Sequence, residues 1–133
     1  MPIPNLDFLT KPEFIRPILL TVHQQMTTRI FDEGKDVNNQ LIGEYSEGYI
    51  RTRERRGLGS NPKVILQFTG QMRNDFSLVS DGQNFGSGFK NRSNAEKSEW
   101  VEDTYDKIIF SATQEEQELL VDLINKGIND KIT

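Results

Sequence analysis

One amphipathic segment in the first third of the chain constrains the fold more than any other feature. From residue 15 its apolar side chains recur at steps of three and four, which places them on one face of a helix. They are Ile15, Ile18, Leu19, Val22, Met26 and Ile30. Gly34 then provides a C-terminal stop. The sequence predicts a long helix over residues 12–33 whose apolar stripe must be covered by other elements.

The start of this helix is less sharply marked than its apolar face. Thr10 and Glu13 have the spacing of a capping box. Pro17 lacks the backbone N–H that a helix interior uses, and its ring crowds the preceding turn. We therefore expect either a start near Arg16, with Pro17 in the first turn, or a kink at Pro17.

Two stretches carry few marks of regular structure. Pro2 and Pro4 favour an extended N-terminal arm, or a frayed end, over residues 1–10. Residues 34–62 begin with turn formers and continue with aromatic and basic side chains, and a short helix over 46–56 fits within them. A connection this long in a compact domain is typically functional or disordered. We expect a long loop over residues 34–62.

The centre of the chain predicts a small antiparallel sheet. KVILQFT, residues 63–69, has the composition of a buried strand. A helical turn over residues 71–75 follows. FSLVS and NFGSGF then have the pattern of two strands joined by a Gly-bearing turn. We therefore expect a hairpin that packs beside the first strand.

Two further capping boxes, Ser93 with Glu96 and Thr113 with Glu116, predict two C-terminal helices. The first spans residues 94–106, and its packing side consists of Ala95, Tyr105 and either Trp100 or Val101. The apolar face of the second consists of Leu119, Leu120, Leu123, Ile124 and Ile128. A long N-terminal helix, a small antiparallel sheet and two C-terminal helices packed on the sheet make an α+β fold.

Length and composition exclude several classes of protein. The 133 residues fit a single domain spanning 1–133. The chain has no Cys, which excludes disulfides and thiolate chemistry. Its start lacks the pattern of a signal peptide, and no apolar run is long enough to span a membrane, so we expect no membrane partner. A net charge of −4 argues against wrapping of nucleic acid.

The sequence offers no constellation that carries catalysis or binds a metal. The single His, His23, lies in the middle of the first predicted helix, where a surface or hydrogen-bonded role is expected. Asp36, Asn38 and Gln40 alternate as in a calcium loop, but Leu41 occupies the position of the required glycine. FGSGF matches no phosphate-binding motif. We therefore expect no cofactor, no metal site and no enzymatic activity.

A cluster of aromatic and basic residues is the strongest candidate for a functional surface. It consists of Tyr45, Tyr49, Arg51, Arg53, Arg55 and Arg56. Guanidinium groups with nearby aromatic rings suit contacts with phosphates, so a nucleic-acid-binding module is one interpretation. The same arginines can pair with carboxylates of a neighbouring subunit. The acidic net charge favours the contact with protein.

The order of segments resembles a known family. An amphipathic helix ends in RIFDEG, and the loop DVNNQLIGEYSEGY and the basic segment RTRERRG follow. LQFTGQMRNDF, FGSGF and the capped helix TQEEQELLVDLI come next. Over about residues 20–130 the chain resembles the bacteriophage virion-morphogenesis, or tail-completion, family of head–tail connector and neck proteins. We expect the Thr69-Gly70 turn to lead from the strand to Met72 and Phe76, which we place in the core.

The resemblance implies a structural virion protein, assembled in the host bacterial cytoplasm. Such a neck, tail-completion or tail-terminator subunit forms a homo-oligomeric ring, hexameric or dodecameric, at the head–tail junction. Its partners are the neighbouring neck, portal or adaptor and tail-tube proteins, and DNA at most passes through the channel. The long loop and the arm become inter-subunit contacts. The basic segment Arg51–Arg56 then faces an acidic surface such as Glu96–Asp106 of the next copy.

The residues leave two other interpretations open. One is the nucleic-acid-binding module that uses Arg51–Arg56. The other is a small regulatory or enzyme-associated domain that carries no motif.

Overall fold

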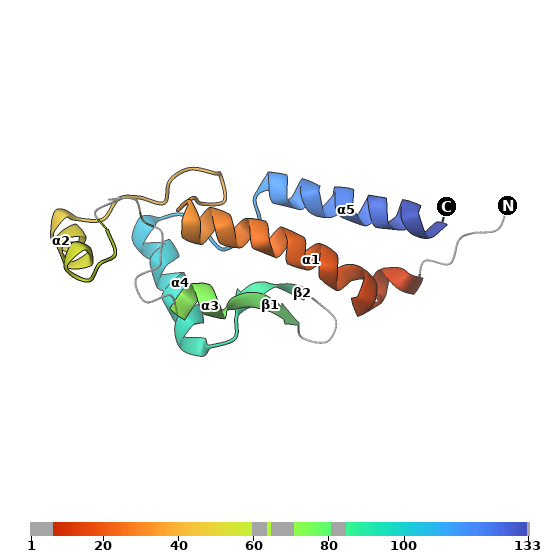
Figure 1. Ribbon diagram of the computed structural model, residues 1–133, viewed down its shortest axis with the longest axis horizontal. Helices are drawn as coiled ribbons and strands as arrows, with labels where there is room; N and C mark the ends of the chain where they lie inside the picture. The colour runs from red at the N-terminus through yellow and green to blue at the C-terminus, as the bar shows by residue number, and fades with distance from the viewer. Residues whose placement is uncertain (1–6, 60–63, 65–70, 81–84, 133) are drawn as a thin grey trace.

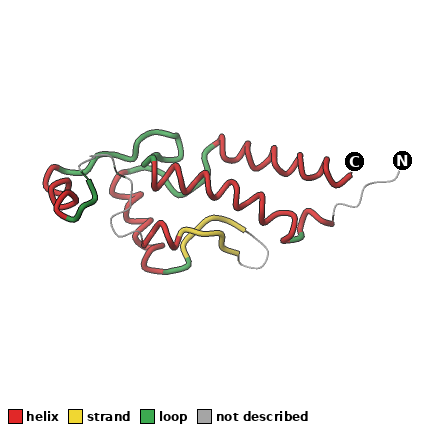
Figure 2. The backbone as a smooth tube through the Cα atoms, viewed as in Figure 1, coloured by secondary structure: helices red, strands yellow, loops and turns green. Residues whose placement is uncertain are grey.

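A computed structural model describes residues 7–59, 64, 71–80 and 85–132. Figures 1 and 2 trace its helices, its one hairpin and the loops that join them. In chain order the elements are η1 (Asp7–Thr10), α1 (Pro12–Thr27), η2 (Thr28–Asp32), α2 (Glu47–Arg55), α3 (Gln71–Asp75), β1 (Phe76–Ser80), β2 (Phe85–Phe89), α4 (Arg92–Tyr105) and α5 (Gln114–Ile132). η1 is a 3₁₀ turn and η2 is π-helical.

Helix α1 forms the middle of the molecule. α5 runs along one side of α1, while the β1–β2 hairpin and α4 lie on the other side (Figure 1). The strands pair antiparallel, from Phe76 opposite Phe89 to Ser80 opposite Phe85. α1 packs on β1 and α4 packs on β2. The predicted α+β class, with a long N-terminal helix and a small antiparallel sheet, is therefore confirmed.

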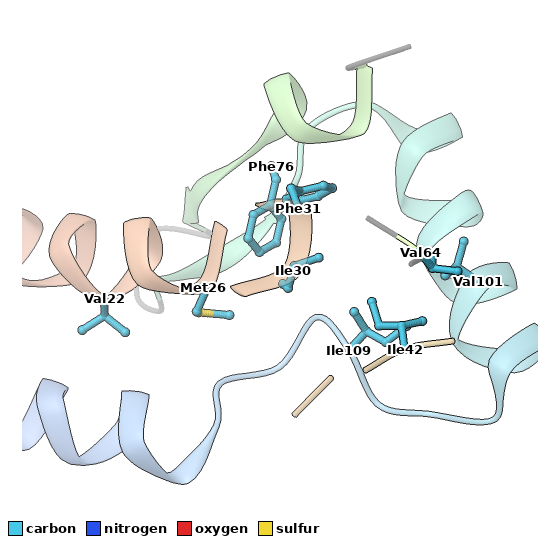
Figure 3. Close-up of a cluster of buried hydrophobic side chains, with 9 residues drawn as sticks. All are labelled: Val22, Met26, Ile30, Phe31, Ile42, Val64, Phe76, Val101 and Ile109. Carbon is cyan, nitrogen blue, oxygen red and sulfur yellow. The ribbon is translucent and has the colours of Figure 1, made fainter. Parts of the chain in front are cut away.

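The core lies where η2, the hairpin, α4 and the link before α5 meet (Figure 3). Its buried members are Val22, Met26, Ile30, Phe31, Ile42, Val64, Phe76, Val101 and Ile109. Phe76 contacts the rings of Phe31 and Phe89 at centroid distances of 5.7 and 5.2 Å. Met72 packs against this cluster while remaining half-buried. The apolar stripe of the first helix thus continues through η2 and anchors the fold.

The first helix covers almost the whole predicted range of residues 12–33, and it begins at Pro12, not near Arg16. α1 and η2 together cover residues 12–32, and Gly34 follows with a φ of +67°. The N-cap is Lys11, and no side chain forms a capping hydrogen bond at this helix start. The predicted capping box of Thr10 with Glu13 is therefore wrong. Pro12 at the first helical position needs no N–H and supplies a suitable φ instead. Pro17 consequently lies inside the helix, not in its first turn.

Of the two capping boxes predicted for the C-terminal helices, the structure contains one. Thr113 N donates to Glu116 Oε1 at 2.9 Å, and Glu116 N donates to Thr113 Oγ1 at 3.0 Å. This capping box is confirmed. Helix α4 begins earlier than predicted, because Asn91 Oδ1 accepts from Ser93 N at 2.8 Å. The predicted capping box of Ser93 with Glu96 is wrong, because Asn91 is the N-cap and its side chain already accepts from Ser93 N.

A buried ion pair joins the end of the first helix to the start of the last. Arg29 Nε donates to Glu116 Oε2 at 2.9 Å, and both side chains are almost inaccessible to solvent. The same guanidinium donates to the carbonyl oxygens of Lys35, Ile109 and Ser111. Satisfied donors lower the cost of burying the Arg29 charge, and these hydrogen bonds hold the link before α5 in place.

His23 ties α1 to both strands. Its Nε2 lies 3.0 Å from the Phe76 carbonyl oxygen and its Nδ1 lies 2.8 Å from Ser87 Oγ. Because a carbonyl only accepts, Nε2 carries the proton and Nδ1 accepts from the serine hydroxyl. Burial lowers the pKa of His23 below its usual 6.5, against a smaller opposite effect of the Phe76 carbonyl. The prediction of a hydrogen-bonded structural His is confirmed.

The two stretches with weak sequence marks contain short helices. Residues 7–10 of the expected extended arm form η1, and the Phe8 ring packs edge-on against Phe14 at 4.9 Å, so the extended prediction is wrong for them. α2 occupies the middle of residues 34–62, within the range allowed for a short helix. The predicted strand 63–69 lies outside the described residues except for Val64, which is buried.

Asp36 forms a turn where the sequence alternates Asp36, Asn38 and Gln40 as in a calcium loop. Its Oδ1 accepts from the backbone N–H groups of Asn38 and Gln40, at 2.9 and 3.0 Å. An Asp that bonds its own following backbone forms a turn. This turn closes the bridge between Lys35 and Leu41.

Candidate interaction surface

Helix α2 divides the predicted arginine cluster between two faces. Ser46 caps the helix by accepting from Tyr49 N at 3.2 Å. Side chains four positions apart share a helix face, and those two positions apart do not. Arg51 and Arg55 are accordingly exposed, whereas Arg53 is 3% exposed. Arg56, which is also exposed, follows them at the C-cap, and the role of these three residues as inter-subunit contacts stays a prediction.

Arg53 is a wrong prediction as a surface contact. Its guanidinium carbon lies 4.8 Å from the centre of the Tyr45 ring, in the arrangement of a cation–π pair. Tyr45 in turn lies 4.8 Å from the Tyr49 ring. Within the described part of the chain, Arg53 Nε and Nη1 have no hydrogen-bond acceptor. The Arg53 side chain therefore packs against the Tyr45 ring below the surface.

All three tyrosines and the single tryptophan of the chain line one groove. The groove has a volume of about 640 Å³ and lies between the start of α2 and one side of α4. Its apolar lining consists of Tyr45, Tyr49, Met72, Trp100, Val101 and Tyr105. Glu44 and Lys97 add one charge of each sign. A gathering of amphipathic aromatic rings at one accessible hollow is typical of a binding surface.

Trp100 is the residue that the sequence pattern placed least well. The prediction left Trp100 and Val101 as alternatives for the packing side of the helix. Val101 is buried in the core, and Trp100 is 66% exposed at the groove. An exposed Trp leaves a large apolar surface in contact with solvent. Such a surface often marks a binding site, so the exposure of Trp100 points to the groove.

Tyr105 remains a neutral hydrogen-bond donor in the groove. Burial raises its pKa above the usual 10.0, and the neighbouring phenols of Tyr45 and Tyr49 raise it further. Gly43 approaches the same ring so closely that an added Cβ would lie 3.1 Å from it. The ring therefore has little room to move.

An acidic stripe follows the exposed face of α4. Glu96, Glu99 and Asp103 recur at steps of three and four and are all exposed. Glu102 instead turns inward, where its Oε2 accepts from the backbone N–H groups of Ile109 and Phe110 at 2.6 and 3.2 Å. The acidic surface predicted over residues 96–106 is thus present, with Glu102 serving the fold.

The residues that the structure covers contain neither a cluster suited to a metal ion nor a helix suited to crossing a membrane. Among them, no three His, Asp or Glu side chains approach one another closely enough to hold a metal ion. No helix that the structure describes has the length and apolar character needed to cross a membrane. The chain matches no protein-family model, no curated protein and no solved structure.

Proposed function

We propose that this chain is a structural subunit of a tailed bacteriophage, acting in a ring at the head–tail junction as a neck, tail-completion or tail-terminator protein. The order of its segments, which resembles that family, supports the assignment. The described surface adds support, since it presents charged faces that suit contact with protein. The ring is hexameric or dodecameric, with portal or adaptor and tail-tube proteins as neighbours.

One observation carries the proposal. Helix α2 carries a basic face, which we define as the exposed Arg51 and Arg55, and α4 carries the acidic stripe. The two helices lie toward the same end of an elongated molecule (Figure 1). Because the two faces carry opposite charge, the basic face of α2 in one copy pairs with the acidic stripe of α4 in the next copy. Contacts of this heterologous kind generate closed rings or helical arrays. Charge complementarity also fixes the register of such contacts.

The alternative, a nucleic-acid-binding module, loses part of its basis. Burial of Arg53 removes one of the four guanidinium groups that were available for phosphates. The acidic stripe of α4 lies at the same end of the molecule and repels a phosphate backbone. Strong DNA binding by the purified chain that falls steeply with salt would favour this alternative.

A charge exchange tests the contact between copies. The double variant Arg51→Glu/Arg55→Glu opposes like charges across the proposed contact, as does Glu99→Lys/Asp103→Lys. We expect each to lower incorporation of the chain into phage particles at least about tenfold, the effect of about 1.4 kcal/mol. Combining the four changes re-creates opposite charges and restores incorporation.

The matched control is Lys126→Glu/Lys131→Glu on α5, which makes the same change in net charge away from both faces. This control should incorporate normally. Normal incorporation of both double variants, or no recovery in the fourfold variant, would contradict the pairing of these two faces.

A further inference from the structure

We propose that the aromatic groove binds the proline-bearing segment, residues 1–6, of another copy of this chain. The inference rests on the proposed function, because it adds an end-to-end contact between copies to the side-by-side contact of α2 with α4. It assigns the groove an occupant that neither the charged faces nor the family resemblance specifies.

The groove has the chemistry that proline-rich segments require. Such segments lie against flat aromatic rings, and their backbone carbonyl oxygens need donors because the conformation has no internal hydrogen bonds. Tyr45, Tyr49 and Trp100 supply rings, while the Tyr105 hydroxyl and the Lys97 ammonium supply donors. Stacking on Arg53 orients the Tyr45 ring beforehand. Fixing a ring in advance lowers the entropy lost on binding.

Residues 1–6 have the matching composition. They read MPIPNL, with Pro2 and Pro4 separated by Ile3. Each proline fixes its own φ and disfavours the helical conformation for the residue before it. The segment therefore loses little conformational freedom when it binds in an extended form. Its side chains are apolar apart from Asn5.

The groove is out of reach for residues 1–6 of the same molecule. The segment precedes η1, which lies at the end of the molecule opposite α2 (Figure 1). Six extended residues span at most about 21 Å. α1 alone, with 16 residues, is about 24 Å long and lies between η1 and the groove. The occupant must therefore come from a second copy, which joins opposite ends of two molecules.

Trp100 provides a direct test, since no other tryptophan contributes to the emission. A peptide of residues 1–10 is titrated into dilute full-length chain. We expect a saturable blue shift of the emission as the 66%-exposed ring is covered. A peptide with Pro2→Gly and Pro4→Gly should bind at least about tenfold more weakly, because it loses two rings and gains flexibility.

Two protein variants locate the site. Tyr49→Ala removes a ring of the groove and should weaken peptide binding at least about tenfold. Val121→Ala, an exposed apolar residue on α5, should leave binding unchanged. Circular dichroism establishes that both variants are folded. Equal binding of the native and double-glycine peptides would overturn the proposal.

Other occupants predict different results. A shift that appears as the chain self-associates, without any response to the peptide, would assign the groove to another part of a second copy. No shift in either experiment would assign it to a different protein. Both outcomes overturn this inference while leaving the proposed function intact, because the charge exchange between α2 and α4 does not involve the groove.

Discussion

Two arginines with the same 3% exposure show how differently a buried charge can be used. Arg29 donates to Glu116 and to three carbonyl oxygens, so its burial is compensated and serves the fold. Arg53 stacks on Tyr45 and leaves two nitrogens without an acceptor among the described residues. The sequence alone does not separate these roles, because each depends on partners distant in the chain.

At His23 the structure predicts a dependence of stability on pH. Its pKa is lowered by burial in the folded state, so protonation is more favourable in the unfolded chain. The contribution of neutral His23 to stability is therefore fully present above pH 6.5. It is lost as the pH falls from 6.5 toward the pKa of His23 in the folded state. Thermal unfolding between pH 7.5 and 5 should give a falling Tm in buffers of about constant ionic strength.

The variant His23→Gln is the control, since the chain has no second His that titrates in this range. It lowers Tm by removing a buried contact, and it should flatten the dependence between pH 7.5 and about 5.5. An equally steep loss in the variant would place the titrating group elsewhere.

At the scale of elements, local sequence was sufficient where the partners are close in the chain. The box of Thr113 with Glu116 is confirmed because its two hydrogen bonds lie within one turn. The hairpin was predictable for the same reason. The box starting at Ser93 is wrong because a better acceptor, Asn91, stands just before it.

The arginine cluster was misjudged for a geometric reason. Taken as a loop, residues 51–56 form one basic patch. As helix α2, the same residues turn by about 100° each, which sends Arg53 inward and leaves Arg51 and Arg55 outside. The groove was missed because its rings come from separate segments, 45–49 and 100–105, that only the fold brings together.

Gly127 sets the separation of α1 and α5. A Cβ at this position would lie 2.6 Å from Phe14 Cε2, so the helices meet where α5 has no side chain. Alanine favours a helix over glycine by about 1 kcal/mol, but here the ring of Phe14 must move. We expect Gly127→Ala to lower Tm in the native chain.

The same change should raise Tm in a Phe14→Ala background, where the space is open and only the helix preference remains. Thermal unfolding of the four chains gives the coupling between the two positions. An equal effect of Gly127→Ala in both backgrounds would show that α1 and α5 do not approach each other at this point.

At the scale of the whole molecule, the two ends differ in chemistry. One end carries the basic face of α2, the acidic stripe of α4 and the aromatic groove, and the other carries η1 and the end of α5 (Figure 1). An elongated molecule with unlike ends and unlike faces suits repeated contacts in one direction. These unlike ends fit the proposal that the chain is one part of an ordered assembly.

Quantitative mass spectrometry of purified phage particles that encode this chain tests that claim most directly. We expect the chain in intact virions at about six to twelve copies per particle, as for one closed ring, and far below the copy numbers of the major capsid and tail-tube proteins. Its absence from intact virions, with abundant protein in the infected cells, would contradict a structural role at the head–tail junction.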